Sequence, residues 1–211
     1  MKKLLQFACA STLFFSAASC NKSDSKTVTP APPAPIISTP LTVQAERTLG
    51  WGKGRATNDA YLSVSMGGGQ IKTWRTVGSN DTSIQNKVDV VFPGDWGNAG
   101  GPVTICNPVE GGAGGAAYEY CTNWLRKKGT RFVFMPGTFQ RAQFDATTTV
   151  EQVAQIFATG YVSGWDASTK QGTSFAIQTE EGIYAIAYIT SVLGTYGSTG
   201  STIKLILKVQ P

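Results

Sequence analysis

The sequence predicts a β-rich α+β fold that is mostly antiparallel sheet, with a three-stranded meander at the C-terminus and one or two short helices. Three observations lead to this prediction. The last third of the chain contains three β-rich runs, at residues 174–180, 183–192 and 201–209. The final run carries an apolar residue at every second position from Ile203 to Val209, and one upstream segment has the spacing of an amphipathic helix.

The three C-terminal runs are typical of an antiparallel meander. Glu181-Gly182 separates the first two runs and predicts a tight hairpin. In the last run, apolar residues at every second position face one way, while Lys204 and Lys208 face the other. This alternation predicts a sheet with one buried face and one polar face.

The helix is predicted after residue 148. Thr148 and Glu151 have the spacing of a capping box, and the apolar positions of the next two turns follow at helical intervals. Gly160 then ends the helix. Weaker patterns predict a helix within residues 118–128 and strands at residues 41–49, 61–66, 71–77, 88–92, 103–106 and 131–135.

We expect the chain to be organised in three parts. Residues 1–19 form a signal peptide, residues 20–40 a tether, and residues 41–211 a single globular domain. The tether contains five of the ten prolines and cannot bury a core. An extended segment of this composition could hold a domain up to about 60 Å from its anchor.

The first residues have the layout of a secretory signal. Lys2 and Lys3 precede an apolar run at residues 4–15, which is too short to span a membrane as a mature helix. No other stretch of the sequence is long and apolar enough to span one. Small residues then lead to Cys20.

These small residues resemble the lipobox of bacterial lipoproteins, although Ala17 stands where that motif usually has Leu. The resemblance implies that Cys20 is acylated and becomes the new N-terminus. Two or more acyl chains give stable anchoring, which implies an outer-membrane lipoprotein at the periplasmic face or the cell surface. The alternative is an ordinary signal that is cleaved after Ala18 or Ser19.

The composition excludes several chemistries. The chain of 211 residues contains no His, which excludes Ser-His-Asp and Cys-His catalysis and zinc sites built on His. The formal charge of +5 is weakly basic, and Lys2 and Lys3 leave with the signal, so no nucleic-acid partner is expected. We expect neither a cofactor nor a metal.

Two cysteines remain in the domain. In an oxidising compartment Cys106 and Cys121 are predicted to form a disulfide. Closing a loop of about 15 residues would stabilise the fold by about 3 kcal/mol. The alternative is a pair of buried thiols.

Carboxylates are the remaining candidates for acid–base catalysis, because His is absent. Those in predicted loops or at strand ends are Asp89, Asp95, Glu110, Glu119 and Asp145. Asp89 is unusual because it lies within the apolar run Val-Asp-Val-Val, where we expect it to face solvent or to bond a turn. The sequence does not pair these residues, so we expect no enzyme activity and keep a carboxylate-dependent hydrolase as an alternative.

Tryptophans in glycine-rich loops are the candidates for binding. Trp51 and Trp96 are each followed by Gly, and such rings can stack on sugars or peptides. The glycine-rich runs themselves lack the Lys-Ser/Thr of a phosphate-binding loop. They are therefore interpreted as turns and loops.

Several short motifs resemble uncharacterised single-domain lipoproteins of the Bacteroidota. They are Tyr-Leu-Ser-Val at 61–64, Asn-Lys-Val-Asp-Val-Val-Phe at 86–92, Gln-Phe-Asp-Ala-Thr-Thr at 143–148, Gly-Ile-Tyr-Ala-Ile at 182–186 and Ile-Lys-Leu-Ile-Leu-Lys-Val-Gln at 203–210. The motifs correspond to strands and turns, so the resemblance implies a fold but no catalytic residues.

The function that we expect is non-catalytic binding of a glycan, a peptide or a partner protein by a membrane-anchored envelope lipoprotein. The alternatives are a structural or assembly subunit of an envelope complex, and a hydrolase that uses two carboxylates instead of His.

Overall fold

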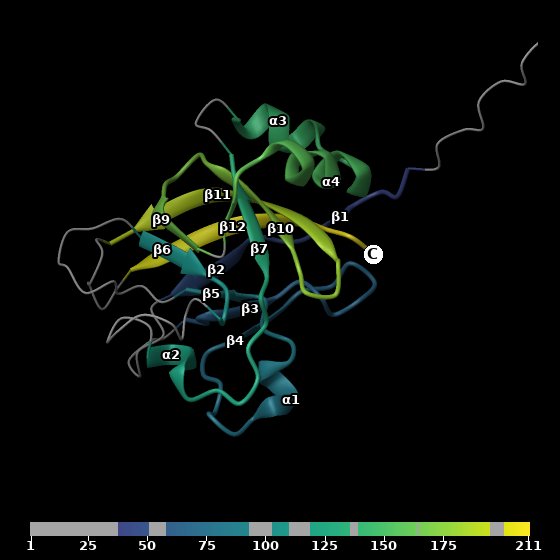
Figure 1. Ribbon diagram of the computed structural model, residues 1–211. Coiled ribbons are helices and arrows are strands. Elements are labelled where there is room, and N and C mark those ends of the chain that lie inside the picture. Colours follow the sequence, from purple (N-terminus) through teal and green to yellow (C-terminus); the bar gives the residue numbers. More distant parts are fainter. Residues whose placement is uncertain are drawn as a thin grey trace, which may run out of the picture. The chain divides into compact units, whose positions relative to one another are not determined.

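The computed structural model describes residues 38–50, 58–92, 103–109, 119–135, 139–163, 165–194 and 201–211. All of them fall within the unit Ile37–Pro211. Two antiparallel sheets stack face to face in this unit, and short helices lie on the outer side of each sheet (Figure 1). The predicted β-rich α+β class with a C-terminal meander is confirmed.

The larger sheet contains the C-terminal meander at its centre. In spatial order its strands are β1 (Thr42–Val43), β12 (Thr202–Val209), β11 (Tyr184–Leu193), β10 (Ser174–Gln178), β7 (Arg131–Phe134) and β8 (Val162–Ser163), and β2 (Arg47–Gly50) also pairs with β12. Gly182 adopts a φ of +83° in the β10–β11 hairpin, a left-handed conformation that favours glycine. The predicted hairpin turn is therefore confirmed.

The smaller sheet has five strands. In spatial order they are β4 (Lys72–Trp74), β3 (Tyr61–Ser63), β5 (Val90–Val91), β6 (Val103–Cys106) and β9 (Trp165–Thr169). β8 and β9 are almost contiguous in the chain, yet β8 pairs with β7 of the larger sheet and β9 with β6 of the smaller one. This segment therefore links the two sheets.

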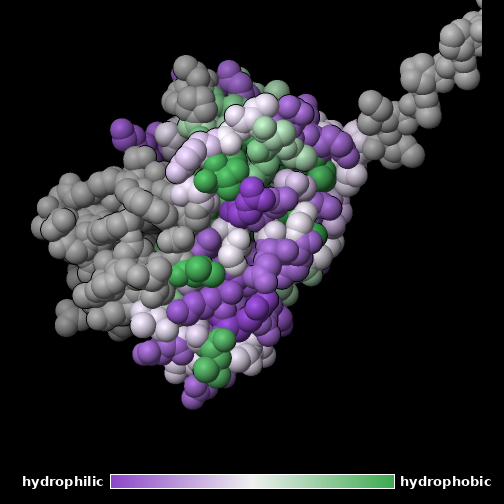
Figure 2. Space-filling view, in the orientation of Figure 1, coloured by the Kyte–Doolittle hydropathy of each residue, from purple (hydrophilic) through white to green (hydrophobic). Residues whose placement is uncertain are grey.

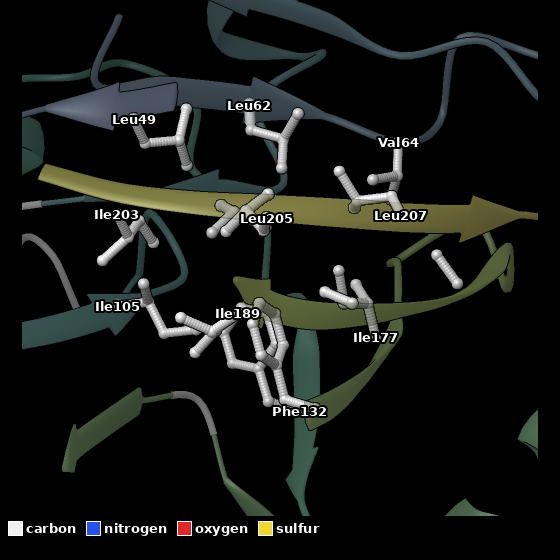
Figure 3. Close-up of a cluster of buried hydrophobic side chains, with 14 of the residues drawn as sticks. Leu49, Leu62, Val64, Ile105, Phe132, Ile177, Ile189, Ile203, Leu205 and Leu207 are labelled. Atoms are coloured by element: carbon white, nitrogen blue, oxygen red, sulfur yellow. The ribbon is translucent and has the colours of Figure 1, made fainter. Parts of the chain in front are cut away.

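The main core lies between the sheets. Leu205 and Leu207 of β12 point from the larger sheet towards Leu62 and Val64 of the smaller sheet, and all four are buried (Figure 3). Alternate residues of a strand face opposite sides of its sheet. The residues of β10, β11 and β12 that alternate with these core residues therefore face the outer side of the larger sheet. A second cluster covers that outer side and includes Phe144 and Val153 from two helices.

The helices are short, as expected. They are α1 (Thr82–Gln85), α2 (Glu119–Thr122), α3 (Arg141–Ala146) and α4 (Val150–Thr159). α3 and α4 cover the larger sheet, whereas α1 and α2 lie beside the smaller one (Figure 1). No helix in the described ranges is long and apolar enough to cross a membrane.

α4 confirms the helix predicted from spacing. Its N-cap is Thr149, whose side chain accepts a hydrogen bond from the backbone N–H of Gln152, and the Gln152 side chain accepts one from the backbone N–H of Thr149. The capping box thus lies one residue later than the Thr148–Glu151 pair predicted from the sequence. Gly160 ends the helix, as predicted.

The polar face predicted for β12 is wrong at Lys208. This residue is only 6% exposed because α3 and α4 cover that side of the sheet. Its ammonium donates to the carbonyls of Phe144, Asp145 and Thr147, at 2.8–2.9 Å, and so supplies a charged donor to carbonyls at the C-terminal end of α3. Burial lowers the pKa of Lys208 below its ordinary value.

Residues 39–44 attach the chain to the fold where the described domain begins. The Thr39 backbone N–H donates to both carboxylate oxygens of Glu151, and its carbonyl accepts from Val150. Leu41 donates to the carbonyl of Thr148, and β1 then pairs with β12. The entering chain is therefore bonded first to the start of α4 and then to the edge of the larger sheet.

Candidate functional site

Several residues singled out from the sequence lie outside the described residues. These are Cys20, Trp51, Trp96, Asp95 and Glu110. Glu119 begins α2, but its side chain is likewise outside the described part. Asp89, Asp145, Cys106 and Cys121 can be placed.

The two cysteines are buried in one hydrophobic cluster with Tyr61 and Trp124. The structure has both side chains as buried thiols. The disulfide between Cys106 and Cys121 stays a prediction, with two buried thiols as its alternative. Burial raises the pKa of Cys121 to about 12, although nearby Lys127 opposes this rise. A thiol with this pKa is protonated at neutral pH and is a poor nucleophile.

Asp89 lies directly before β5 and is fully buried, so the part of the prediction that placed it towards solvent is wrong. The other part, that it bonds a turn, is confirmed. Its Oδ2 accepts from the backbone N–H groups of Val64 and Ser65, at 2.8 and 3.0 Å, and from the hydroxyls of Ser63 and Ser65. The carboxylate thus fixes the chain that leaves β3.

Lys128 completes this buried network. Its ammonium forms ion pairs with Asp89 and with Glu181 of the β10–β11 hairpin, the latter at 2.8 Å, and donates to the Ser65 hydroxyl at 2.8 Å. These partners use all three N–H groups of the ammonium, so no lone pair points at Ser65 to remove its proton. The network joins four segments of the chain: residues 63–65, Asp89, Lys128 and Glu181. Its contacts hold these segments together.

A His-free hydrolase would need two carboxylates, and Asp89 and Glu181 are brought close together by their contacts with Lys128. Lys128 lies between Asp89 and Glu181, so these two side chains flank an ammonium and leave no space for a glycosidic bond. Over the described ranges, no three His, Cys, Asp or Glu side chains gather in a group that could hold a metal ion.

A polar pocket of about 460 Å³ opens on the helix-covered side of the larger sheet. We call it the Tyr188 pocket. Its walls come from the start of α3, from the turn between β9 and β10, and from β11. The lining residues are Gln140, Arg141, Lys170, Gln171, Gly172, Thr173 and Tyr188.

The turn that forms one wall is held by its own hydrogen bonds. The Thr173 backbone N–H and hydroxyl both donate to the Lys170 carbonyl, at 3.2 and 2.6 Å. Gly172 has a φ of +84°, and its N–H donates to the carbonyl of Ile189 on β11. These bonds hold Lys170 and Gln171 at the rim beside Tyr188.

Aromatic rings and a guanidinium form the opposite wall. The Tyr188 ring lies 5.6 Å from the Phe144 ring, and the Arg141 guanidinium lies 5.3 Å from the Tyr188 centroid and 5.8 Å from that of Phe144. Arg141 Nε donates to both oxygens of Asp145 at 2.9 Å, one helical turn along α3. Ring contacts and an ion pair together fix the guanidinium.

Several polar groups at the pocket have no protein partner within the described part of the chain. They are the two terminal nitrogens of Arg141, the ammonium of Lys170, the amide of Gln171 and the hydroxyl of Tyr188. Water or a ligand can satisfy them. Sequence reasoning missed this site because its walls are distant in the chain, and the Arg141–Asp145 spacing was the one local signal.

The surface in Figure 2 is mainly hydrophilic, and its hydrophobic residues form separate patches. The described residues that are large, hydrophobic and exposed also come from separate segments, with Leu125 and Tyr161 the most exposed. Residues scattered in this way are normal on a monomer. The Tyr188 pocket is therefore the candidate ligand site.

The fold defines a β-rich α+β protein built of two packed antiparallel sheets. It is similar to the crystal structure of a DUF4466 family protein from Parabacteroides merdae, with a TM-score of 0.50 and 13% sequence identity. The match covers 81% of this chain and 54% of that one, so this chain spans about half the length of its structural neighbour. The sequence matches no family model and no curated protein.

At this identity the similarity shows the fold alone. The neighbour comes from a member of the Bacteroidota.

Proposed function

We propose that this protein is a lipid-anchored envelope protein whose domain binds a glycan without catalysing its reaction. The Tyr188 pocket is the observation that supports binding. Its aromatic ring, hydroxyl, amide and cationic groups converge on a space of about 460 Å³. Sugar-sized ligands fit pockets of this volume, and sugars offer both C–H faces for a ring and hydroxyls for donors.

The anchoring part of the proposal is supported by the sequence. A charged start, a short apolar run and small residues before Cys20 precede a Pro-rich tether. Acylation at Cys20 would hold the domain at the outer membrane, and the tether would let it reach ligands away from the bilayer.

Cell fractionation tests the anchor. The Cys20→Ala variant should leave the membrane fraction, whereas Cys9→Ala, which removes the other cysteine of the N-terminal region, should remain there. Mass spectrometry of the membrane-bound chain should find acyl groups at residue 20. A Cys20→Ala protein that still sediments with membranes would contradict the anchor.

A glycan array probed with the full chain tests binding. Gln171→Ala should weaken binding because the Gln171 amide lines the pocket and has no protein partner in the described structure. Gln155→Ala is the matched control, since Gln155 is exposed on α4 and does not line the pocket. Trp51→Ala and Trp96→Ala test whether these two rings also contact the ligand. Absence of binding to every glycan would refute the proposal.

A further inference from the structure

We infer that the ligand of the Tyr188 pocket carries a carboxylate, as a uronic acid does, and that Arg141 binds this group. The inference rests on the proposed glycan-binding function and narrows it to acidic sugars. It follows from the charge of the pocket, from the way Arg141 is held, and from the size of the space.

The charge of the lining favours an anion. Arg141 and Lys170 are its two charged residues, and both are cationic. The carboxylate of Asp145 is bonded to Arg141 Nε and does not line the pocket. A neutral sugar would bring no negative charge to this cationic lining, whereas a carboxylate could pair with the terminal nitrogens of Arg141 and with Lys170.

Arg141 is held in a geometry suited to a carboxylate. Its Nε is bonded to Asp145, and its planar group lies near the rings of Tyr188 and Phe144. The two terminal nitrogens remain without a protein partner in the described structure. A guanidinium presents these two nitrogens as a fork that matches the two oxygens of a carboxylate. Because the contacts already orient this group, less conformational freedom is lost on binding.

Lys170 adds a second positive charge on the opposite wall. The turn hydrogen bonds of Thr173 fix its backbone, and its ammonium has no ion-pair partner among the described residues. An exposed ammonium contributes a salt-dependent attraction at short range. Binding of an acidic sugar should therefore weaken as the salt concentration rises.

The size of the space favours a sugar acid over a bare anion. A free carboxylate or phosphate would occupy a small part of about 460 Å³ and would leave the Tyr188 ring and the Gln171 amide facing water. A uronic acid places its carboxylate on a ring whose hydroxyls and C–H face can reach both groups. Both the carboxylate and the sugar ring of such a ligand would therefore contact the pocket.

Calorimetry on the full chain tests this inference with two ligands that differ at one carbon. Glucuronic acid and glucose carry a carboxylate and a CH₂OH group, respectively, at the same position. We expect glucuronic acid to bind roughly ten-fold more tightly, the size of one charge-assisted bidentate contact at a half-exposed site. Acetate and inorganic phosphate, as bare anions, should bind more weakly than glucuronic acid.

Three variants locate the contact. Arg141→Gln should remove most of the preference for glucuronic acid over glucose, and Arg141→Lys should keep only part of this preference. Arg131→Gln is the matched control, because Arg131 is an exposed arginine of β7 in the larger sheet and is bonded to Gln178 outside the pocket. Circular dichroism should show that all three variants fold.

The possible results separate the two proposals. Equal binding of glucose and glucuronic acid, with no effect of Arg141→Gln, would overturn the carboxylate inference and leave glycan binding in place. Tighter binding of phosphate than of glucuronic acid would also overturn it, in favour of an anion site. If no sugar binds and the glycan array is also empty, both proposals fail.

Discussion

Replacing Lys128 with Met should strongly destabilise the fold, because it removes one partner of a buried ion pair. The side chain is 1% exposed and pairs with Asp89, which is fully buried, and with Glu181, which is half exposed. Removing one partner of a buried ion pair leaves the other charge uncompensated and typically costs about 3–5 kcal/mol.

The structure places this change near the lower end of that range. Asp89 would keep its two backbone N–H donors and the two serine hydroxyls, and Met fills nearly the volume of the lysine stem. We therefore expect a loss of about 3 kcal/mol, a large part of the about 5–15 kcal/mol that stabilises an ordinary domain.

Urea unfolding followed by tryptophan fluorescence measures this loss. The midpoint should fall for Lys128→Met with little change in the slope. Lys127→Met is the matched control. Among the described residues the Lys127 ammonium is bonded to the carbonyl of Thr122 alone, at an exposed site, so the substitution should change stability by less than about 0.5 kcal/mol. A Lys128→Met variant within about 1 kcal/mol of the unaltered chain would refute the reasoning and show that the turn alone satisfies Asp89.

The pH dependence gives a second readout for the same network. Desolvation opposes ionisation of Glu181, but the hydrogen bond from Lys128 and those from its own backbone and Thr179 outweigh it, so the pKa of Glu181 lies below its ordinary value of 4.5. A carboxylate whose pKa is lower in the folded state stabilises the fold above its ordinary pKa. This contribution is lost as the pH falls below 4.5 through the lowered pKa, and Lys128→Met should reduce it.

Three further predictions concern other parts of the fold. Lys208→Met should cost roughly 2 kcal/mol in urea unfolding, because three carbonyls at the end of α3 lose a charged donor, and an unchanged midpoint would contradict this. Gly160→Ala should destabilise by more than about 2 kcal/mol, because its Cβ would lie 2.2 Å from Cγ1 of Val133, and a neutral effect would show that α4 shifts freely. Cys106 and Cys121 should resist a thiol reagent in the native chain and react once it is unfolded without reductant, whereas a disulfide would leave both unreactive throughout.

Much of the fold could be predicted because strong local patterns agree with the final packing. Every second residue of β12 from Ile203 to Val209 is apolar and buried, and the Val153 side of α4 has helical spacing and is buried. Local propensity and tertiary burial act in the same direction at these elements, so the sequence alone was sufficient.

The errors occur where a residue's neighbours come from distant segments. Alternation places Lys208 on the second face of β12, but nothing nearby in sequence indicates that α3 covers that face. α3 itself was missed because its six residues bury only Phe144, and distant groups stabilise it. Asp89 was ambiguous for the same reason, since Lys128 lies far from it in the sequence.

The candidate site was less predictable than the fold. Sequence reasoning favoured tryptophans in glycine-rich loops, whereas the described pocket uses Tyr188, Arg141 and the turn before β10. These residues contribute single polar groups to a shared space and carry no motif of their own. Their proximity depends on the β10–β11 register and on the position of α3 over it.

The bonds that hold Thr39 and Leu41 to the start of α4 would have a mechanical consequence under the proposed anchoring at Cys20. A force applied through the N-terminal segment would reach these bonds before it reaches β1 or the rest of the larger sheet. These few hydrogen bonds at the exposed start of α4 would break first, and they can form again when the force ends. Unfolding under such a force would therefore begin at residues 39–41 and continue to β1, before it reaches the core between the two sheets.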